Sequence, residues 1–160
     1  MKIKRRDFIG TSAAAVLGLA LAPGLAFGDD RKLRLGFIGV GLRGTWHLEN
    51  SLKRGDVEIA AICDIDPGRL DICRQHIADA GRNPAREFGG GEYDYRNLLE
   101  IRDLDAVIIS TPWLWHTPMA VDAMKAGKYA GVEVSAATSL AECWDLVNTH
   151  EETGTHMMIL

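Results

Sequence analysis

The sequence predicts an α/β fold, a doubly wound parallel sheet preceded by a signal peptide. Short apolar runs alternate with longer amphipathic ones from about Lys32 to the end of the chain, which is the pattern of parallel strands connected by helices. A glycine motif, Gly39-x-Gly41-x-x-Gly44, comes directly after the first apolar run. An acidic residue, Asp64, comes directly after the second run, and the first 28 residues have the composition of an export signal.

The composition is that of one ordinary globular domain. The chain has 160 residues, of which 25% are charged, and a formal net charge of −4. This length can bury a core, and the slightly acidic balance excludes a nucleic-acid-binding protein of the usual basic kind. Cys63, Cys73 and Cys143 are too few and too scattered for a disulfide framework or a metal site. We therefore expect no metal, and we expect all three cysteines to be small buried apolar residues.

Residues 1–28 are predicted to be a cleavable targeting segment. Arg5 and Arg6 precede an acidic residue and a phenylalanine, an apolar run covers residues 13–21, and small residues suit cleavage after Gly28. The run is too short for a permanent membrane-spanning helix, so no permanent membrane anchor is expected. The arginine pair resembles a twin-arginine signal, which predicts export to the periplasm by the twin-arginine machinery. An ordinary secretory signal that contains two arginines is the alternative.

The elements up to residue 101 follow from apolar runs and helix-start signals. The segments 33–38 and 57–63 are short and apolar, as buried strands are. Asp66 and Pro67 supply an N-cap and a first-turn proline for the helix after the second strand. We expect strands at 33–38 and 57–63, helices at 45–52, 67–80 and 95–101, and a glycine-rich loop at 81–91 with room for a short edge strand.

The elements after residue 101 continue the alternation. The run 105–110 is almost continuously apolar, as in a parallel strand buried on both faces. Thr117 and Pro118 are expected to begin the next helix, which Gly127 ends in the manner of a C-terminal glycine. Residues 139–142 form a capping box. We expect strands at 105–110, 128–134 and 155–160, with helices at 117–126 and 140–153 between them.

The glycine motif and Asp64 together predict a dinucleotide site of the Rossmann type. Gly39 permits a tight turn, Gly41 lets a pyrophosphate approach the backbone, and Gly44 lets the helix pack closely on the strand. Asp64 lies 20 residues beyond Gly44, where an acid accepts the adenosine ribose hydroxyls and repels a 2′-phosphate. We therefore predict an NAD-binding Rossmann domain over residues 29–160. The alternative is a glycine-rich turn with a turn aspartate, although Asp66 is better placed to cap the helix.

Two further features lie at predicted strand ends. Residues 113–116, Trp-Leu-Trp-His, follow the strand at 105–110, where ligands bind in such sheets. The tryptophans could stack on a nicotinamide, or they could cover the sheet edge or a domain interface. Glu133 could bond the nicotinamide ribose or be a solvated acid. From position alone, both features stay open and His116 is assigned no catalytic role.

These features resemble the Gfo/Idh/MocA family of NAD(P)-dependent proteins that act on sugars. Most members carry Glu-Lys-Pro where this chain reads Glu133-Val134-Ser135, and the absence of the lysine argues against an ordinary sugar dehydrogenase. Within that family, the chain most resembles glycoside hydrolase family 109, whose characterised members are NAD-dependent α-N-acetylgalactosaminidases. The segments that carry this resemblance are 36–44, 111–121, 125–134 and 142–148.

The resemblance implies a set of cofactor contacts. The family's NAD contacts fall on Leu42, Arg43, Asp64, Trp113, Leu114, Trp115, His116, Glu133 and Val134. It also implies that the acid/base and sugar-binding residues, a histidine and several tyrosines, lie in a substrate domain beyond residue 160, so no catalytic residue is assigned here.

The activity implied by the resemblance is a redox-assisted hydrolysis of a small sugar substrate. A hydride passes transiently from C3 of the sugar to NAD, elimination expels the aglycone, water adds, and the hydride returns. One alternative is an exported NAD-dependent sugar oxidoreductase. Another is a truncated NAD-binding module without activity, which would associate through its exposed sheet face as a homo-oligomer.

Overall fold

The computed structural model describes residues 31–160, in which six strands alternate with five helices. The strands are β1 (Leu33–Ile38), β2 (Val57–Cys63), β3 (Arg86–Phe88), β4 (Ala106–Ile109), β5 (Tyr129–Val132) and β6 (Met157–Ile159). The helices are α2 (Leu42–Leu52), α3 (Pro67–Asp79), α4 (Tyr95–Leu99), α5 (Trp113–Lys125) and α6 (Leu140–Thr153). None of these helices is long and apolar enough to cross a lipid bilayer.

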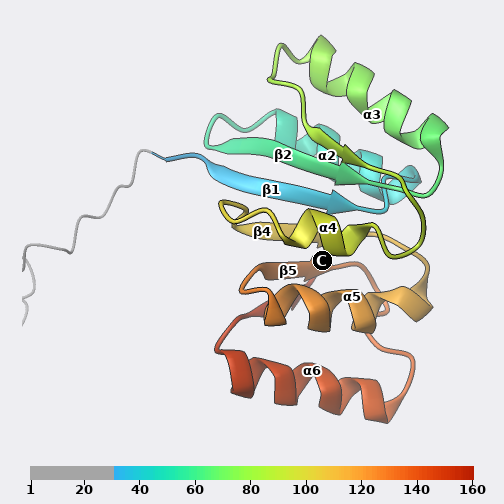
Figure 1. The fold of residues 1–160 in the computed structure, drawn as a ribbon, viewed down its shortest axis with the longest axis vertical. Helices are drawn as coiled ribbons and strands as arrows, with labels where there is room; N and C mark the ends of the chain where they lie inside the picture. The colour runs from blue at the N-terminus through green and yellow to red at the C-terminus, as the bar shows by residue number, and fades with distance from the viewer. Residues whose placement is uncertain (1–30) are drawn as a thin grey trace, which may run out of the picture. The chain divides into compact units, whose positions relative to one another are not determined.

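The strands form a single parallel sheet in the order β3-β2-β1-β4-β5-β6 (Figure 1). Successive strands run outward from β1 in one direction and from β4 in the other, which is the arrangement of doubly wound dinucleotide-binding sheets. The predicted parallel α/β fold is therefore confirmed. The predicted signal peptide, residues 1–28, lies outside the described residues.

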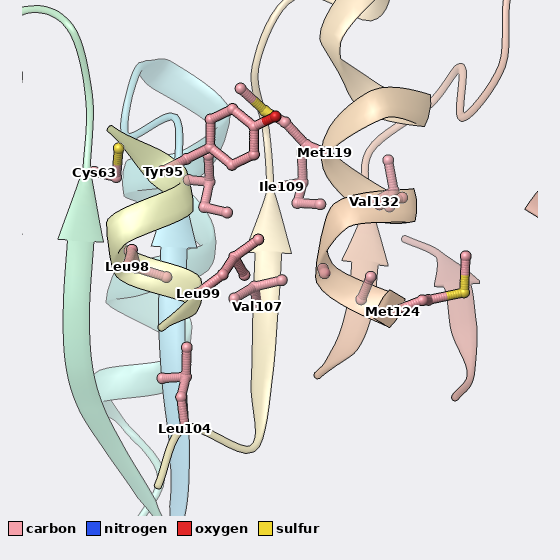
Figure 2. Packing of buried hydrophobic residues seen from close by; sticks show 14 of the residues in the cluster. Cys63, Tyr95, Leu98, Leu99, Leu104, Val107, Ile109, Met119, Met124 and Val132 are labelled. Atoms are coloured by element: carbon pink, nitrogen blue, oxygen red, sulfur yellow. The ribbon is translucent and has the colours of Figure 1, made fainter. Parts of the chain in front are cut away.

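The sheet is buried on both faces, and its strands are apolar for that reason. Phe37 packs in a cluster with the buried side chains of α2 and α3, whereas its neighbour Ile38 packs in a second cluster with those of α4, α5 and α6. Neighbouring residues of a strand point to opposite faces, so the two clusters are the two faces of the sheet. Figure 2 shows the second cluster, in which Tyr95 and Leu98 of α4 and Met119 of α5 lie over the strands.

Helix α5 begins earlier than predicted, and this changes the setting of the tryptophan segment. Pro112 is the N-cap of the helix and Pro118 lies inside it, so the expected start at Thr117 and Pro118 was wrong. An internal proline removes one backbone hydrogen bond, but tertiary contacts hold this turn in place. Thr117 is buried, and its Oγ1 donates to the carbonyl oxygen of Ala136 at 2.8 Å. Residues 113–116 therefore form the first turn of a helix and not a loop.

Other helix termini follow the sequence signals more closely. The Asp66 side chain accepts a hydrogen bond from the Gly68 amide at 2.8 Å, which confirms the predicted N-cap of α3. Gly127 has φ +72° directly after the C-cap of α5, as expected. Helix α2 begins three residues before the predicted start, because Gly41 is its N-cap and the glycine motif itself forms the first turn.

The capping box of α6 is half formed. Ser139 Oγ accepts from the Glu142 amide at 3.2 Å, as predicted. The Glu142 carboxylate accepts instead from the amide and hydroxyl of Thr138, at 2.6 and 2.8 Å.

The cysteines divide into two buried and one exposed. Cys63 and Cys73 are buried, as predicted, but the expected burial of Cys143 was wrong. Helix α6 buries Leu146 and Thr149, whereas Cys143, in the first turn of the helix, is exposed. Burial raises the pKa of the Cys63 thiol to about 12, so this group remains a neutral thiol near pH 7 and is a poor nucleophile.

Candidate cofactor site

The turn between β1 and α2 is shaped by its three glycines. Gly39 has φ +80°, and a Cβ there would lie 2.9 Å from the carbonyl oxygen of Ser110. A Cβ on Gly44 would lie 1.9 Å from the carbonyl oxygen of Gly39, so only glycine lets the first turn of α2 pack against this loop. A Cβ on Gly41 would meet no described atom within 4 Å. Gly41 thus faces open space. Its φ of −64° is not in the left-handed region and no atom crowds it, so the fold gives no steric reason for a glycine here.

A pocket of about 210 Å³ opens beside this turn. It lies at the carboxyl ends of β1, β2 and β4, where the strand order reverses and where open α/β sheets bind ligands. Its lining includes Gly39, Gly41, Asp64, Ser110, Thr111 and Trp115. The structure therefore brings the predicted glycine motif, the predicted acid and one tryptophan of the segment 113–116 to one concave site.

Asp64 joins the end of β2 to the glycine turn. Its Oδ2 accepts from the Val40 amide at 2.8 Å, and its Oδ1 accepts from the Asp66 amide at 2.9 Å. A carboxylate offers about four acceptor positions, so Asp64 keeps capacity for hydroxyl groups in the pocket that it lines. The residue therefore combines the turn role with the geometry expected of a ribose acceptor.

Ser110 contributes a polar atom that the fold leaves unsatisfied. Its Oγ is buried and has no hydrogen-bond partner among the residues that the structure describes. An unpaired buried hydroxyl costs about 1–3 kcal/mol, and Ser110 lines the pocket beside Gly39. The empty space over Gly41 and this unpaired hydroxyl both fit a bound dinucleotide, with its pyrophosphate at the amino end of α2.

The four residues of the tryptophan segment face different environments. Trp113 and Leu114 are exposed, and Trp115 is half-buried in the pocket wall, edge-on to Tyr93 and Tyr95. His116 is fully buried, and its two ring nitrogens lie 2.7 and 2.8 Å from the carbonyl oxygens of Thr111 and Ser135. The His116 ring thus connects the chain after β4 to the chain after β5, and only Trp115 of the four lines the pocket.

Glu133 follows β5 and is buried, so it is not the solvated acid of the alternative interpretation. Its Oε1 accepts from Arg43 Nε at 2.9 Å, from Arg43 Nη2 at 2.6 Å and from His47 Nε2 at 2.6 Å. Burial raises the pKa of Glu133, but the hydrogen bonds from His47 and then Arg43 outweigh it and leave the pKa below its usual value. The carboxylate is therefore ionised near pH 7, and His47 Nε2 is the donor in its bond. Val134, the next residue, is exposed.

Sequence reasoning missed His47 in this cluster. The signal was present, because His47 lies four residues after Arg43 and residues at that spacing share one face of a helix. Nothing in the sequence pairs that face with Glu133, which lies 86 residues further along the chain. Only the parallel pairing of the sheet brings the two together.

Within residues 31–160, no group of three or more His, Cys, Asp and Glu side chains is arranged to hold a metal ion. The chemistry of this edge of the sheet comes from carboxylates, amides and aromatic rings. Such groups recognise hydroxyls, phosphates and flat heterocycles.

Comparison with known proteins agrees with this geometry. The model of the Gfo/Idh/MocA oxidoreductase family, NAD-binding Rossmann fold, matches residues 33–160. A glycosyl hydrolase family 109 protein from Parabacteroides distasonis is 50% identical and covers 82% of this chain, and an alpha-N-acetylgalactosaminidase from Tannerella forsythia is 45% identical and covers all of it. The chain spans 28% and 39% of the length of these two relatives.

Solved structures give the same fold. The WlbA dehydrogenase from Bordetella pertussis, in complex with NADH and UDP-GlcNAcA, superposes with a TM-score of 0.67 at 25% identity. That superposition covers 81% of this chain and 37% of the dehydrogenase. A putative myo-inositol dehydrogenase from Sinorhizobium meliloti superposes with a TM-score of 0.69 at 19% identity, over 81% of this chain and 36% of its own. The chain therefore belongs to the Gfo/Idh/MocA oxidoreductase family and carries that family's NAD-binding Rossmann domain.

Proposed function

We propose that this chain is the N-terminal, NAD-binding part of an exported glycosidase that hydrolyses N-acetylgalactosaminides by transient oxidation at C3, elimination and addition of water. The observation that carries the cofactor half of this proposal is the pocket over Gly41, bounded by Asp64 and the unpaired Ser110 hydroxyl. The glycosidase half is supported by the name and 45% identity of the Tannerella forsythia relative. It is also supported by residues 133–135, Glu-Val-Ser, which supply no lysine at the end of β5.

Different residues of the chain would bind different parts of the cofactor. The amides of the glycine turn and the amino end of α2 would bind the pyrophosphate. Asp64 would accept the adenosine ribose hydroxyls and disfavour a 2′-phosphate, while Glu133 would face the nicotinamide ribose. NAD, when bound, supplies a hydride acceptor that stays with the enzyme from one turnover to the next.

The location and extent of the protein are part of the same proposal. Residues 1–28 would direct export through the twin-arginine machinery to the periplasm. A retained cofactor suits such an enzyme, because a protein exported in the folded state can carry NAD with it. Since the chain spans 28–39% of the two relatives, we place the acid/base groups and most sugar contacts in protein outside residues 31–160.

The test is activity of the complete protein on a chromogenic N-acetyl-α-galactosaminide. We expect release of the chromophore that requires bound NAD and produces no net NADH. Absence of release by the NAD-loaded protein would contradict the glycosidase. Net NADH accumulation with the free sugar would support an exported sugar oxidoreductase instead, and NAD binding without either reaction would indicate a binding module.

A further inference from the structure

Three N–H donors approach one carboxylate oxygen of Glu133, more than that oxygen can accept with good geometry. Arg43 Nε, Arg43 Nη2 and His47 Nε2 all approach Oε1, within 2.6–2.9 Å. A carboxylate oxygen has about two acceptor positions, so three donors crowd one atom. The other oxygen, Oε2, accepts among the described residues only from the Val134 amide, at 3.3 Å. One donor can therefore leave Oε1 without exposing an unpaired charge.

The two cationic partners differ in how firmly the fold holds them. The Arg43 side chain is 60% exposed, whereas those of His47 and Glu133 are 15% and 8% exposed. Arg43 donates from two nitrogens to the single oxygen Oε1. It does not form the bidentate arrangement, with one N–H bonded to each carboxylate oxygen, that makes arginine–carboxylate pairs strong. Its guanidinium lies 5.0 Å from the Trp46 ring. Arg43 is thus an exposed, replaceable partner, and His47 is the enclosed one.

We propose that His47 is a positioning residue, which holds the Glu133 carboxylate in place while Arg43 turns from Glu133 to the bound dinucleotide. The inference rests on the proposed NAD site. Arg43 lies two residues after Gly41, at the amino end of α2, where the phosphates of a dinucleotide bind. When Arg43 turns to them, the bond from His47 to Oε1 holds the Glu133 carboxylate in place, and Oε2 keeps capacity to accept from a ribose hydroxyl.

The experiment compares His47→Leu and His47→Gln in the full chain, with NAD affinity measured by calorimetry and folding by thermal melts. Leucine removes the donor, and a hydrogen bond to a charged group is strong enough for NAD binding to weaken about tenfold or more. Glutamine places an amide donor near the Nε2 position, so its affinity should stay within about threefold of the parent. His76→Leu is the matched control, because His76 is a partly buried histidine on α3 whose Nδ1 lies 3.4 Å from Oε1 of another glutamate, Glu49.

A double-mutant cycle with Glu133→Ala separates positioning from general stability. In the Glu133→Ala background, His47→Leu should change NAD affinity by less than about twofold, since the carboxylate that it positions is gone. Parent-like affinity in a folded His47→Leu variant would overturn the inference, as would failure of a folded His47→Gln variant to restore binding. An undiminished His47→Leu effect in the Glu133→Ala background would overturn it as well. If the parent chain itself does not bind NAD, the proposed function fails before this question arises.

Discussion

Replacing Gly44 by alanine is expected to lower the free energy of unfolding by about 3 kcal/mol or more. Alanine is intrinsically better in a helix by about 1 kcal/mol, so propensity alone predicts the opposite. The new Cβ, however, would lie 1.9 Å from the carbonyl oxygen and 2.9 Å from the carbonyl carbon of Gly39. Both contacts are with backbone, which cannot rotate away as a side chain can, and overpacking of this kind costs 1–3 kcal/mol or more even without a backbone clash.

The measurement is urea unfolding of the full chain followed by circular dichroism, with and without the substitution. We expect a large fall in the midpoint of Gly44→Ala. An unchanged midpoint would contradict the close packing of α2 on the glycine turn. The matched control is the same change at Gly41, where no described atom lies within 4 Å of the new methyl group.

In contrast to Gly44→Ala, Gly41→Ala is expected to keep the stability of the parent but to lose affinity for NAD. Its backbone is extended, with φ −64° and ψ −157°, and a Cβ there would meet no described atom within 4 Å, so the free energy of unfolding should stay within about 1 kcal/mol of the parent. The methyl group would project into the space that a pyrophosphate needs in order to reach the backbone amides. Losing two charge-assisted hydrogen bonds is worth about 3 kcal/mol or more, so NAD affinity should fall at least about 100-fold.

Calorimetric titration of NAD and a urea unfolding curve on the same Gly41→Ala sample test this prediction. Parent-like NAD affinity together with parent-like stability would show that the dinucleotide does not approach the turn at Gly41. Lost stability would show that the glycine is required by the fold, in conflict with the open space seen there.

Much of the fold was predictable because its signals are local. Apolar runs marked the strands, Asp66 marked the start of α3, and Gly127 marked the end of α5. The start of α5 was not predictable in this way, because Pro118 normally breaks a helix. What holds that turn is the bond from Thr117 to Ala136, a contact between segments 19 residues apart.

In the site, too, the residues with local sequence signals were predictable and the long-range contacts were not. The glycine motif and Asp64 were predictable from spacing, since each lies directly after a strand and parallel strands end at one edge of a sheet. The environment of Glu133 was not, because its partners Arg43 and His47 come from a distant helix. The unpaired hydroxyl of Ser110 could not be predicted from the sequence either, because only the packed structure shows which buried polar atoms lack partners.

The measurement that tests the central claim most directly is calorimetric titration of NAD into the full chain, its Asp64→Ala variant and its Asp66→Ala variant. The two aspartates are two residues apart, but Asp64 lines the pocket and Asp66 only caps α3. We predict that the parent binds NAD with a dissociation constant below about 1 mM and that Asp64→Ala weakens binding about tenfold or more. Asp66→Ala should lose only about 1 kcal/mol of stability. No binding by the folded parent at about 1 mM NAD, or equal affinity in the Asp64→Ala variant, would contradict an NAD site at this edge of the sheet.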